Sequence, residues 1–213
     1  MNDEAPDIQD SRTSGEPSAT PGAGGKGAPK NKRSKGSKAT AAKAAIAATE
    51  ARIGYKFSDS ALLTTAFTHV SALKLATRHR ADSYQRLEFL GDHVLGLIVS
   101  DMLYRAYPRA DEGELSKRLA DLVRKESCAD VAKQLGLTDD IKLGAVGAGA
   151  GARLRKSVLG DICEAVIGAI YLDGGHAAAA EFVARNWTER MRKLRRPLRD
   201  PKTVLQEWAQ GKG

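Results

Sequence analysis

Apolar side chains recur every three or four residues along most of the chain after about position 40, which is the spacing of one face of an α-helix. The most regular segment runs from Tyr84 to about Tyr107. Its apolar positions are Leu87, Leu90, Val94, Leu97, Ile98, Met102 and Leu103. Pro108 follows, and proline cannot continue a helix because it lacks the amide hydrogen and its ring clashes with the preceding turn. The pattern therefore predicts a long helix that ends at this proline.

Other segments have the same helical spacing and end at residues that favour helix boundaries. They predict further helices over Ala44–Ile53, from a cap at Ser58 through Phe67, over Leu115–Val123, about Glu126–Gln134, Ser157–Leu172, Ala177 to about Leu194, and Lys202–Gln210. Few runs are rich in β-branched residues, whereas helix formers such as Ala, Leu, Arg, Glu and Lys recur. The folded part is therefore expected to be all-α.

Polar and glycine-containing segments separate these helices. Loops are expected at Thr77–Ser83 and at the sequence GAVGAGAGA over 144–152, because closely spaced glycines disfavour a helix. A turn is expected at Asp111–Gly113, and helix ends are expected at Gly136 and at Asp173–Gly175.

Residues 1–43 differ from the rest because they are rich in Gly, Pro, Ala, Ser and Lys and have almost no large apolar side chains. Such a segment buries too little apolar surface to offset the entropy cost of ordering it, so we expect a disordered tail. Basic residues gather between positions 26 and 43. They are consistent with a solvating tail or with an arm that binds phosphates without sequence preference.

The chain has a net charge of +8 and a pI of about 9.5, which favours an acidic partner such as nucleic acid. Aromatic residues make up only 5%, which argues against a base-stacking surface for single strands. Cys128 and Cys163 form no CxxC pair. We expect both to be small buried residues in a reducing compartment, because their spacing favours neither a zinc site nor a disulfide framework.

No stretch approaches the roughly 18 consecutive apolar residues that a membrane-spanning helix needs. The N-terminus begins with acidic residues and lacks the apolar core of a secretory signal. We therefore expect a cytoplasmic protein without a membrane partner.

Two pairs of carboxylates interrupt the apolar pattern of the two longest apolar helices. Glu88 and Asp92 are four residues apart and fall about 40° apart on a helix, whereas Asp161 and Glu164 are three apart, so each pair shares a face. Like charges beside a core are costly unless a cation lies between them. Mg²⁺ prefers such oxygen ligands, and Mn²⁺ would also suit them.

Two such ions about 3.5–4 Å apart activate a water molecule and stabilise the leaving oxygen of a phosphodiester. The spacing alone also allows each acid to pair with an Arg or Lys at the surface.

Five segments match, in order, the motifs of a known family. They are Phe67–Ser71 (FTHVS), Tyr84–Leu95 (YQRLEFLGDHVL), Tyr107–Lys117 (YPRADEGELSK), Leu159–Ala169 (LGDICEAVIGA) and Asp200–Gly211 (DPKTVLQEWAQG). The second closely resembles the signature helix of ribonuclease III, and the fourth resembles the family's second acidic helix. The last is similar to the start of the family's double-stranded-RNA-binding domain. The resemblance covers about residues 45–213.

The resemblance implies a homodimer of helical endonuclease domains that cuts both strands of double-stranded RNA and takes no small-molecule substrate. The product ends would carry 5′-phosphates and short 3′ overhangs, and ribosomal precursors and messenger RNA would be the targets. By position, Glu88, Asp92, Asp161 and Glu164 match the family's metal-binding acids, with Asp92 and Glu164 as the catalytic ones. Glu112 matches a further acid near the cleavage site.

The same resemblance divides the chain into the tail 1–43, a catalytic domain over 44–196, a linker over 197–201, and the start of a truncated RNA-binding domain over 202–213. Without the rest of that domain, we expect weaker, salt-sensitive RNA binding that relies partly on a basic cluster. This cluster consists of Arg190, Arg192, Lys193, Arg195 and Arg196.

An alternative is a dimer that binds double-stranded RNA without cutting it. The short chain favours this reading slightly, as does Gln85, which stands where many family members carry an acid. The four intact acids favour the nuclease, because a pure binding protein has no use for buried like charges. A purely structural relative would be expected to lack one or more of them.

Overall fold

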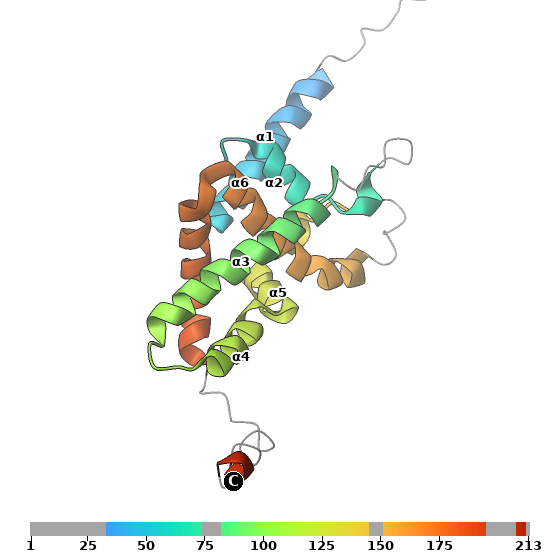
Figure 1. The fold of residues 1–213 in the computed structure, drawn as a ribbon. Helices are drawn as coiled ribbons and strands as arrows, with labels where there is room; N and C mark the ends of the chain where they lie inside the picture. The colour runs from blue at the N-terminus through green and yellow to red at the C-terminus, as the bar shows by residue number, and fades with distance from the viewer. Residues whose placement is uncertain (1–32, 74–81, 145–150, 195–207, 212–213) are drawn as a thin grey trace, which may run out of the picture.

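The computed structural model describes residues 33–73, 82–144, 151–194 and 208–211, and the described part is helical apart from short connections and one isolated bridge (Figure 1). The helices are α1 (Arg33–Ile53), α2 (Ser60–Ala66), α3 (Gln85–Ala106), α4 (Glu112–Val123), α5 (Lys125–Gln134) and α6 (Gly151–Lys193), with short 3₁₀ turns η1 (Val70–Ala72) and η4 (Leu137–Asp140). The all-α prediction is confirmed. No helix within these ranges is long and apolar enough to cross a lipid bilayer.

Several helix boundaries differ from their predictions for local reasons. Helix α1 begins at Arg33, so the prediction of a disordered tail is wrong for residues 33–43, where alanines and lysines favour a helix. Asp59, rather than Ser58, caps α2 by accepting a hydrogen bond from the Ala61 amide. The expected turn at Asp111–Gly113 instead starts α4, because the Asp111 carboxylate caps it by accepting from the Glu114 amide at 2.7 Å.

Helix α3 agrees closely with the most regular apolar pattern, and it ends where Tyr107 closes the last turn. Helix α6 contains both of the last predicted apolar helices. They are separated at Gly175, whose φ of 74° lies outside the helical region and is favourable for glycine. The predicted end of the first apolar helix at Asp173–Gly175 is therefore confirmed, and the chain resumes a helical path immediately after it.

Parts of other predictions lie outside the described residues. They include most of the loop over Thr77–Ser83 and residues 145–150 of the glycine-rich segment. Helix α6 begins at Gly151, so the prediction of a loop is wrong for the last two residues of that segment. Also outside are Arg195, Arg196, the linker 197–201 and most of the last predicted helix.

The core lies mainly between α3 and α6, which cross in Figure 1 as the green and orange helices. Their backbones touch at two glycines. A Cβ atom built on Gly91 of α3 would lie 1.8 Å from the carbonyl oxygen of Glu164, and one on Gly168 of α6 would lie 2.3 Å from that of Leu87. Any larger residue at either glycine would push the helices apart. The crossing therefore depends on the absence of side chains.

The far half of α6 is fixed by Trp187, which is fully buried and donates its indole N–H to the Leu122 carbonyl at 2.9 Å. Near the kink, the Asp173 carboxylate accepts hydrogen bonds from the amides of Ser58 and Asp59 and from the Tyr55 hydroxyl. These contacts hold the part of α6 beyond the kink against α4, and they hold the middle of α6 against the connection between α1 and α2.

Candidate metal centre

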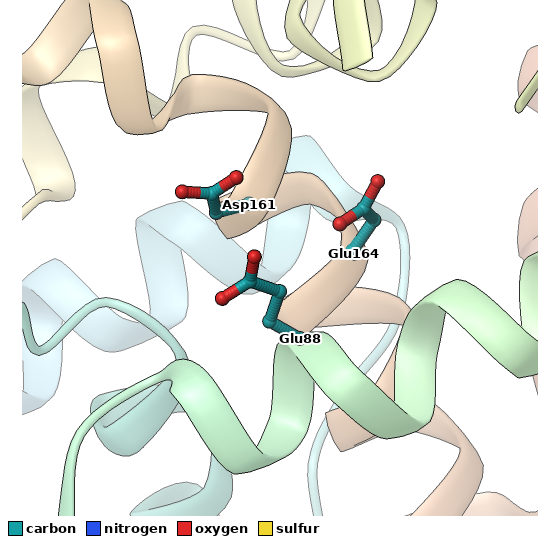
Figure 2. A group of neighbouring side chains, drawn as sticks. All are labelled: Glu88, Asp161 and Glu164. Atoms are coloured by element: carbon teal, nitrogen blue, oxygen red, sulfur yellow. The ribbon is translucent and has the colours of Figure 1, made fainter. Parts of the chain in front are cut away.

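Three of the predicted metal-binding acids meet where α3 crosses α6. Oxygen atoms of Glu88, Asp161 and Glu164 all lie within 4.8 Å of one another. Figure 2 shows Glu88 projecting from α3 toward Asp161 and Glu164 on α6. The close crossing at Gly91 explains this meeting, because Gly91 contacts the backbone of Glu164 itself and Glu88 lies one turn earlier on the same helix.

The acid cluster formed by Glu88, Asp161 and Glu164 is removed from water on one side. Asp161 and Glu164 have only 7% and 9% of their surface exposed, whereas Glu88 is half-buried. Burial, followed by the nearby Asp161 carboxylate, raises the pKa of Glu88 from 4.5 to about 7. Burial, followed by the charges of Asp92 and Asp161, likewise raises the pKa of Glu164 to about 7. The cluster therefore carries more negative charge than its surroundings balance.

Two further side chains contact Asp161. The Lys125 ammonium, from the first turn of α5, forms an ion pair with one carboxylate oxygen. The Tyr84 hydroxyl donates to the other at 3.2 Å, and burial together with Asp161 raises the pKa of this hydroxyl well above its usual range. Neither contact was predicted, because both residues lie far from Asp161 in the sequence and no local pattern marks them. The sequence also allowed each acid to pair with an Arg or Lys, and the structure has such a pair at Asp161.

Asp92 and Glu112 do not join the acid cluster. Asp92 is exposed on α3, one turn beyond Glu88, yet it is near enough for its charge to raise the pKa of both glutamates. Glu112 is exposed at the start of α4 and accepts a hydrogen bond from Ser116.

Both cysteines are buried beneath the acid cluster, as predicted, and both are free thiols. A hydrogen bond with Cys163, together with burial, raises the pKa of the Cys128 thiol, so it stays protonated at neutral pH. Cys128 also forms a hydrogen bond with Glu164 that opposes the rise in the pKa of that acid. The pair fills space behind the acids.

The donor set suits a hard divalent cation. All three groups offer carboxylate oxygen, which Mg²⁺ and Mn²⁺ accept, and no sulfur or imidazole atom belongs to the group within the described residues. A divalent ion would also offset the repulsion that raises the pKa of both glutamates.

The described part of the predicted basic cluster lies at the other end of α6. Arg190 donates to the side chain of Gln134, and Arg192 pairs with Glu189 at 3.0 Å. Arg190 and Lys193 line a surface hollow together with Arg124 of the α4–α5 junction. This hollow is separate from the acid cluster.

Helix α3 also exposes large apolar side chains. Phe89 is 69% exposed, and Leu97 and Tyr104 follow it along the helix. Phe89 borders a hollow of about 690 Å³ whose other apolar walls include Leu62, Leu90 and the exposed Leu172. Exposed apolar surface of this kind next to a hollow is typical of protein interfaces.

Comparison with known proteins identifies the family. The family model described as ribonuclease-III-like matches residues 59–191. The chain is 81% identical over 166 residues to a ribonuclease 3 from Nitrobacter winogradskyi and 82% identical to one from Bradyrhizobium diazoefficiens. These matches cover 78% of this chain but 62% and 66% of the two relatives, so the chain spans less than two thirds of their length.

Solved structures with the same fold are nuclease domains of ribonuclease III from Campylobacter jejuni. One has 37% sequence identity and a TM-score of 0.61, and the match covers 68% of this chain and 96% of that domain. A second has 35% identity and a TM-score of 0.62, with coverage of 70% and 98%. The first is described as showing flexibility in a region involved in dimer formation.

Proposed function

The chain belongs to the ribonuclease III family, and we propose that it is a divalent-metal-dependent endonuclease that cuts double-stranded RNA as a homodimer. The observation that carries the proposal is the acid cluster of Glu88, Asp161 and Glu164 at the crossing of α3 and α6. A binding protein gains nothing from three carboxylates at this depth, because their repulsion and desolvation lower its stability.

Glu88, Asp161 and Glu164 would hold the metal, with Mg²⁺ as the expected ion and Mn²⁺ as a substitute. Asp92 completes the predicted set as the exposed acid whose charge reaches both glutamates. We assign catalytic roles to Glu164 and Asp92. Glu112, exposed at the start of α4, would lie toward the RNA or the partner subunit.

Two divalent ions at such a site would supply an activated water and charge stabilisation for the leaving 3′ oxygen, which would yield 5′-phosphate ends. Neighbouring residues of α3 and α6, and one just before α3, position the acids. The Tyr84 hydroxyl orients Asp161, and the glycine crossing holds Glu88 beside Glu164. No side-chain nucleophile is needed, and the buried, protonated Cys128 could not serve as one.

The apolar face of α3 supports a homodimer. Phe89, with most of its surface exposed, lies beside a hollow bordered by Leu172, and a two-fold axis would place each subunit's phenylalanine against the other's hollow. Two cleavage centres facing one duplex would cut both strands and leave short 3′ overhangs. The basic residues Arg190, Arg192 and Lys193 would add phosphate contacts that weaken with salt.

A cytoplasmic location and the processing of ribosomal and messenger RNA complete the proposal, and they rest on the family resemblance.

The test is cleavage of a labelled, fully paired RNA duplex at low salt, with Mg²⁺ compared with EDTA. Glu164→Gln preserves the shape of the buried acid and removes its charge, whereas Glu181→Gln makes the same change at an exposed position on the same helix. Cutting by the wild type and Glu181→Gln, abolished by EDTA and by Glu164→Gln, would support the nuclease. An intact dimer that binds the duplex and leaves it uncut would instead support the binding protein.

A further inference from the structure

We propose that Lys125 links metal loading to RNA binding: its ammonium holds Asp161 until a divalent ion binds, and it then contacts a phosphate oxygen of the RNA. This inference rests on the proposed function, because it concerns the same acid cluster. It begins from the ion pair between Lys125 and Asp161, which brings a basic residue of α5 to acids of α3 and α6.

Gly160 allows Lys125 to approach the acid cluster. The first turn of α5 passes so close to α6 that a Cβ atom on Gly160 would lie 2.5 Å from Cγ of Lys125 and 2.8 Å from its carbonyl oxygen. Gly160 immediately precedes Asp161. A side chain at this position would push Lys125 away, so the glycine sets the distance between the ammonium and the acid cluster.

Local helix stability does not explain the lysine. Lys125 is the first residue of α5, where the helix dipole disfavours a positive charge. Within the described residues, Asp161 is the carboxylate with which Lys125 forms its ion pair, and that carboxylate belongs to another helix. The position of Lys125 is therefore unfavourable for α5 itself and favourable only for the acid cluster.

The two partners differ in exposure, which places the ammonium on the open side of the acids. The Lys125 side chain is 57% exposed, whereas the Asp161 side chain is 10% exposed. An RNA phosphate must approach the buried acids from the solvent side, so it would meet Lys125 first. The flexible four-carbon stem lets the ammonium turn from Asp161 to a phosphate without movement of the backbone.

Charge balance gives the order of events. Without metal, the ammonium partly neutralises three carboxylates, and with a divalent ion among them it is repelled. A doubly charged ion about 5 Å from an ammonium loses affinity by about tenfold even with strong solvent screening. The released ammonium would then stabilise the anionic phosphate, so metal binding and RNA binding favour each other.

The first experiment measures Mg²⁺ binding to the full chain by calorimetry, without RNA. Lys125→Gln should bind Mg²⁺ about tenfold more tightly than the wild type, because a competing cation is gone. Lys133→Gln is the matched control, since Lys133 lies on the same helix and pairs with Asp130 at 3.1 Å, outside the acid cluster. Unchanged or weaker Mg²⁺ binding by Lys125→Gln would overturn the inference, because a purely structural lysine predicts no gain.

The second experiment measures duplex cleavage at Mg²⁺ concentrations that saturate each variant. Lys125→Gln should lower kcat/KM at least about tenfold, Lys125→Arg should restore much of it, and Lys133→Gln should match the wild type. Wild-type kcat/KM for Lys125→Gln would refute the phosphate contact. If the wild type itself neither binds Mg²⁺ nor cuts, the proposed function fails, whereas loss confined to the Lys125 predictions leaves that function intact.

Discussion

Replacing Gly91 with alanine tests whether the crossing of α3 and α6 builds the metal centre. The new Cβ atom would lie 1.8 Å from the Glu164 carbonyl oxygen, 2.6 Å from its carbonyl carbon and 2.9 Å from the Gly168 nitrogen. All three are backbone atoms, so no side-chain rotation relieves the overlap. An ordinary carbon–oxygen contact is roughly 3.4 Å, and the helices must therefore separate by more than about 1 Å.

Two opposing effects set the size of the stability change. Alanine favours a helix over glycine by about 1 kcal/mol, which would stabilise α3. Overpacking of a core costs about 1–3 kcal/mol when side chains can adjust, and more is expected where backbone meets backbone. We therefore expect a net loss of about 2–3 kcal/mol in the free energy of unfolding, which corresponds to a Tm lower by about 5–10 °C for a domain of this size.

The same separation would move Glu88 away from Glu164. A displacement of about 1 Å at a catalytic site costs up to about 100-fold in rate, so cleavage and Mg²⁺ affinity should fall together. Circular dichroism melting gives the Tm, and duplex cleavage at saturating Mg²⁺ gives the rate.

Gly113→Ala is the control, because its Cβ would meet only the Asp111 carboxylate at an ordinary 3.5 Å. That variant should melt within about 2 °C of the wild type. A Gly91→Ala variant that melted and cut like the wild type would refute the link between this glycine and the acid cluster.

Three other outcomes are expected. Because Glu88 and Glu164 have pKa values raised to about 7, the metal-free fold binds more protons than the unfolded chain between pH 4.5 and 7, so its stability should fall as pH rises through that window. This loss of stability should be on the order of 2 kcal/mol after solvent screening, and saturating Mg²⁺ should reverse it in thermal melts. If stability depended on pH equally steeply in Glu164→Gln and in the wild type, the explanation would be wrong. Asp173→Ala removes three hydrogen-bond acceptor contacts and should lower the free energy of unfolding in urea by about 2 kcal/mol, whereas Asp101→Ala, which breaks an exposed surface pair, should change it by under about 0.5 kcal/mol. Phe89→Glu should give monomers in analytical ultracentrifugation with an unchanged far-ultraviolet spectrum, and a persistent dimer would place the interface elsewhere.

Patterns within one helix could be predicted from the sequence. The apolar spacing gave α3 almost to the residue, because burial of one face is a local, periodic property that a glycine or proline ends sharply. The pairing of Glu88 with the later acids was reached through the resemblance to a family. Helical spacing alone placed each pair on one face and left the two pairs unconnected.

Contacts between helices could not be predicted, because they depend on how the helices cross. Lys125 precedes Asp161 by 36 positions, and nothing in its neighbourhood distinguishes it from Lys133 on the same helix. Asp92 shares a face with Glu88, yet one helical turn along α3 separates a half-buried acid from an exposed one. The extent of α1 was missed because composition was averaged over the whole tail, whereas a helix depends on its own run of alanines and lysines.

The glycines at the helix crossings connect stability with function in a way that neither the apolar pattern nor the acids show alone. Gly91 and Gly168 let α3 and α6 approach until their backbones touch, and Gly160 does the same for α5. The contact between α3 and α6 brings Glu88 beside Glu164, which adds repulsion to the acid cluster. The contact at Gly160 brings the Lys125 ammonium, which partly offsets that repulsion. Packing at the crossings therefore sustains a site whose repulsion Lys125 relieves in part and a divalent ion would relieve further. For this reason, metal affinity and thermal stability should fall together in variants of Gly91 and Gly168. A larger residue at Gly160 should instead lower thermal stability while raising Mg²⁺ affinity, because it moves the Lys125 ammonium away from the acids.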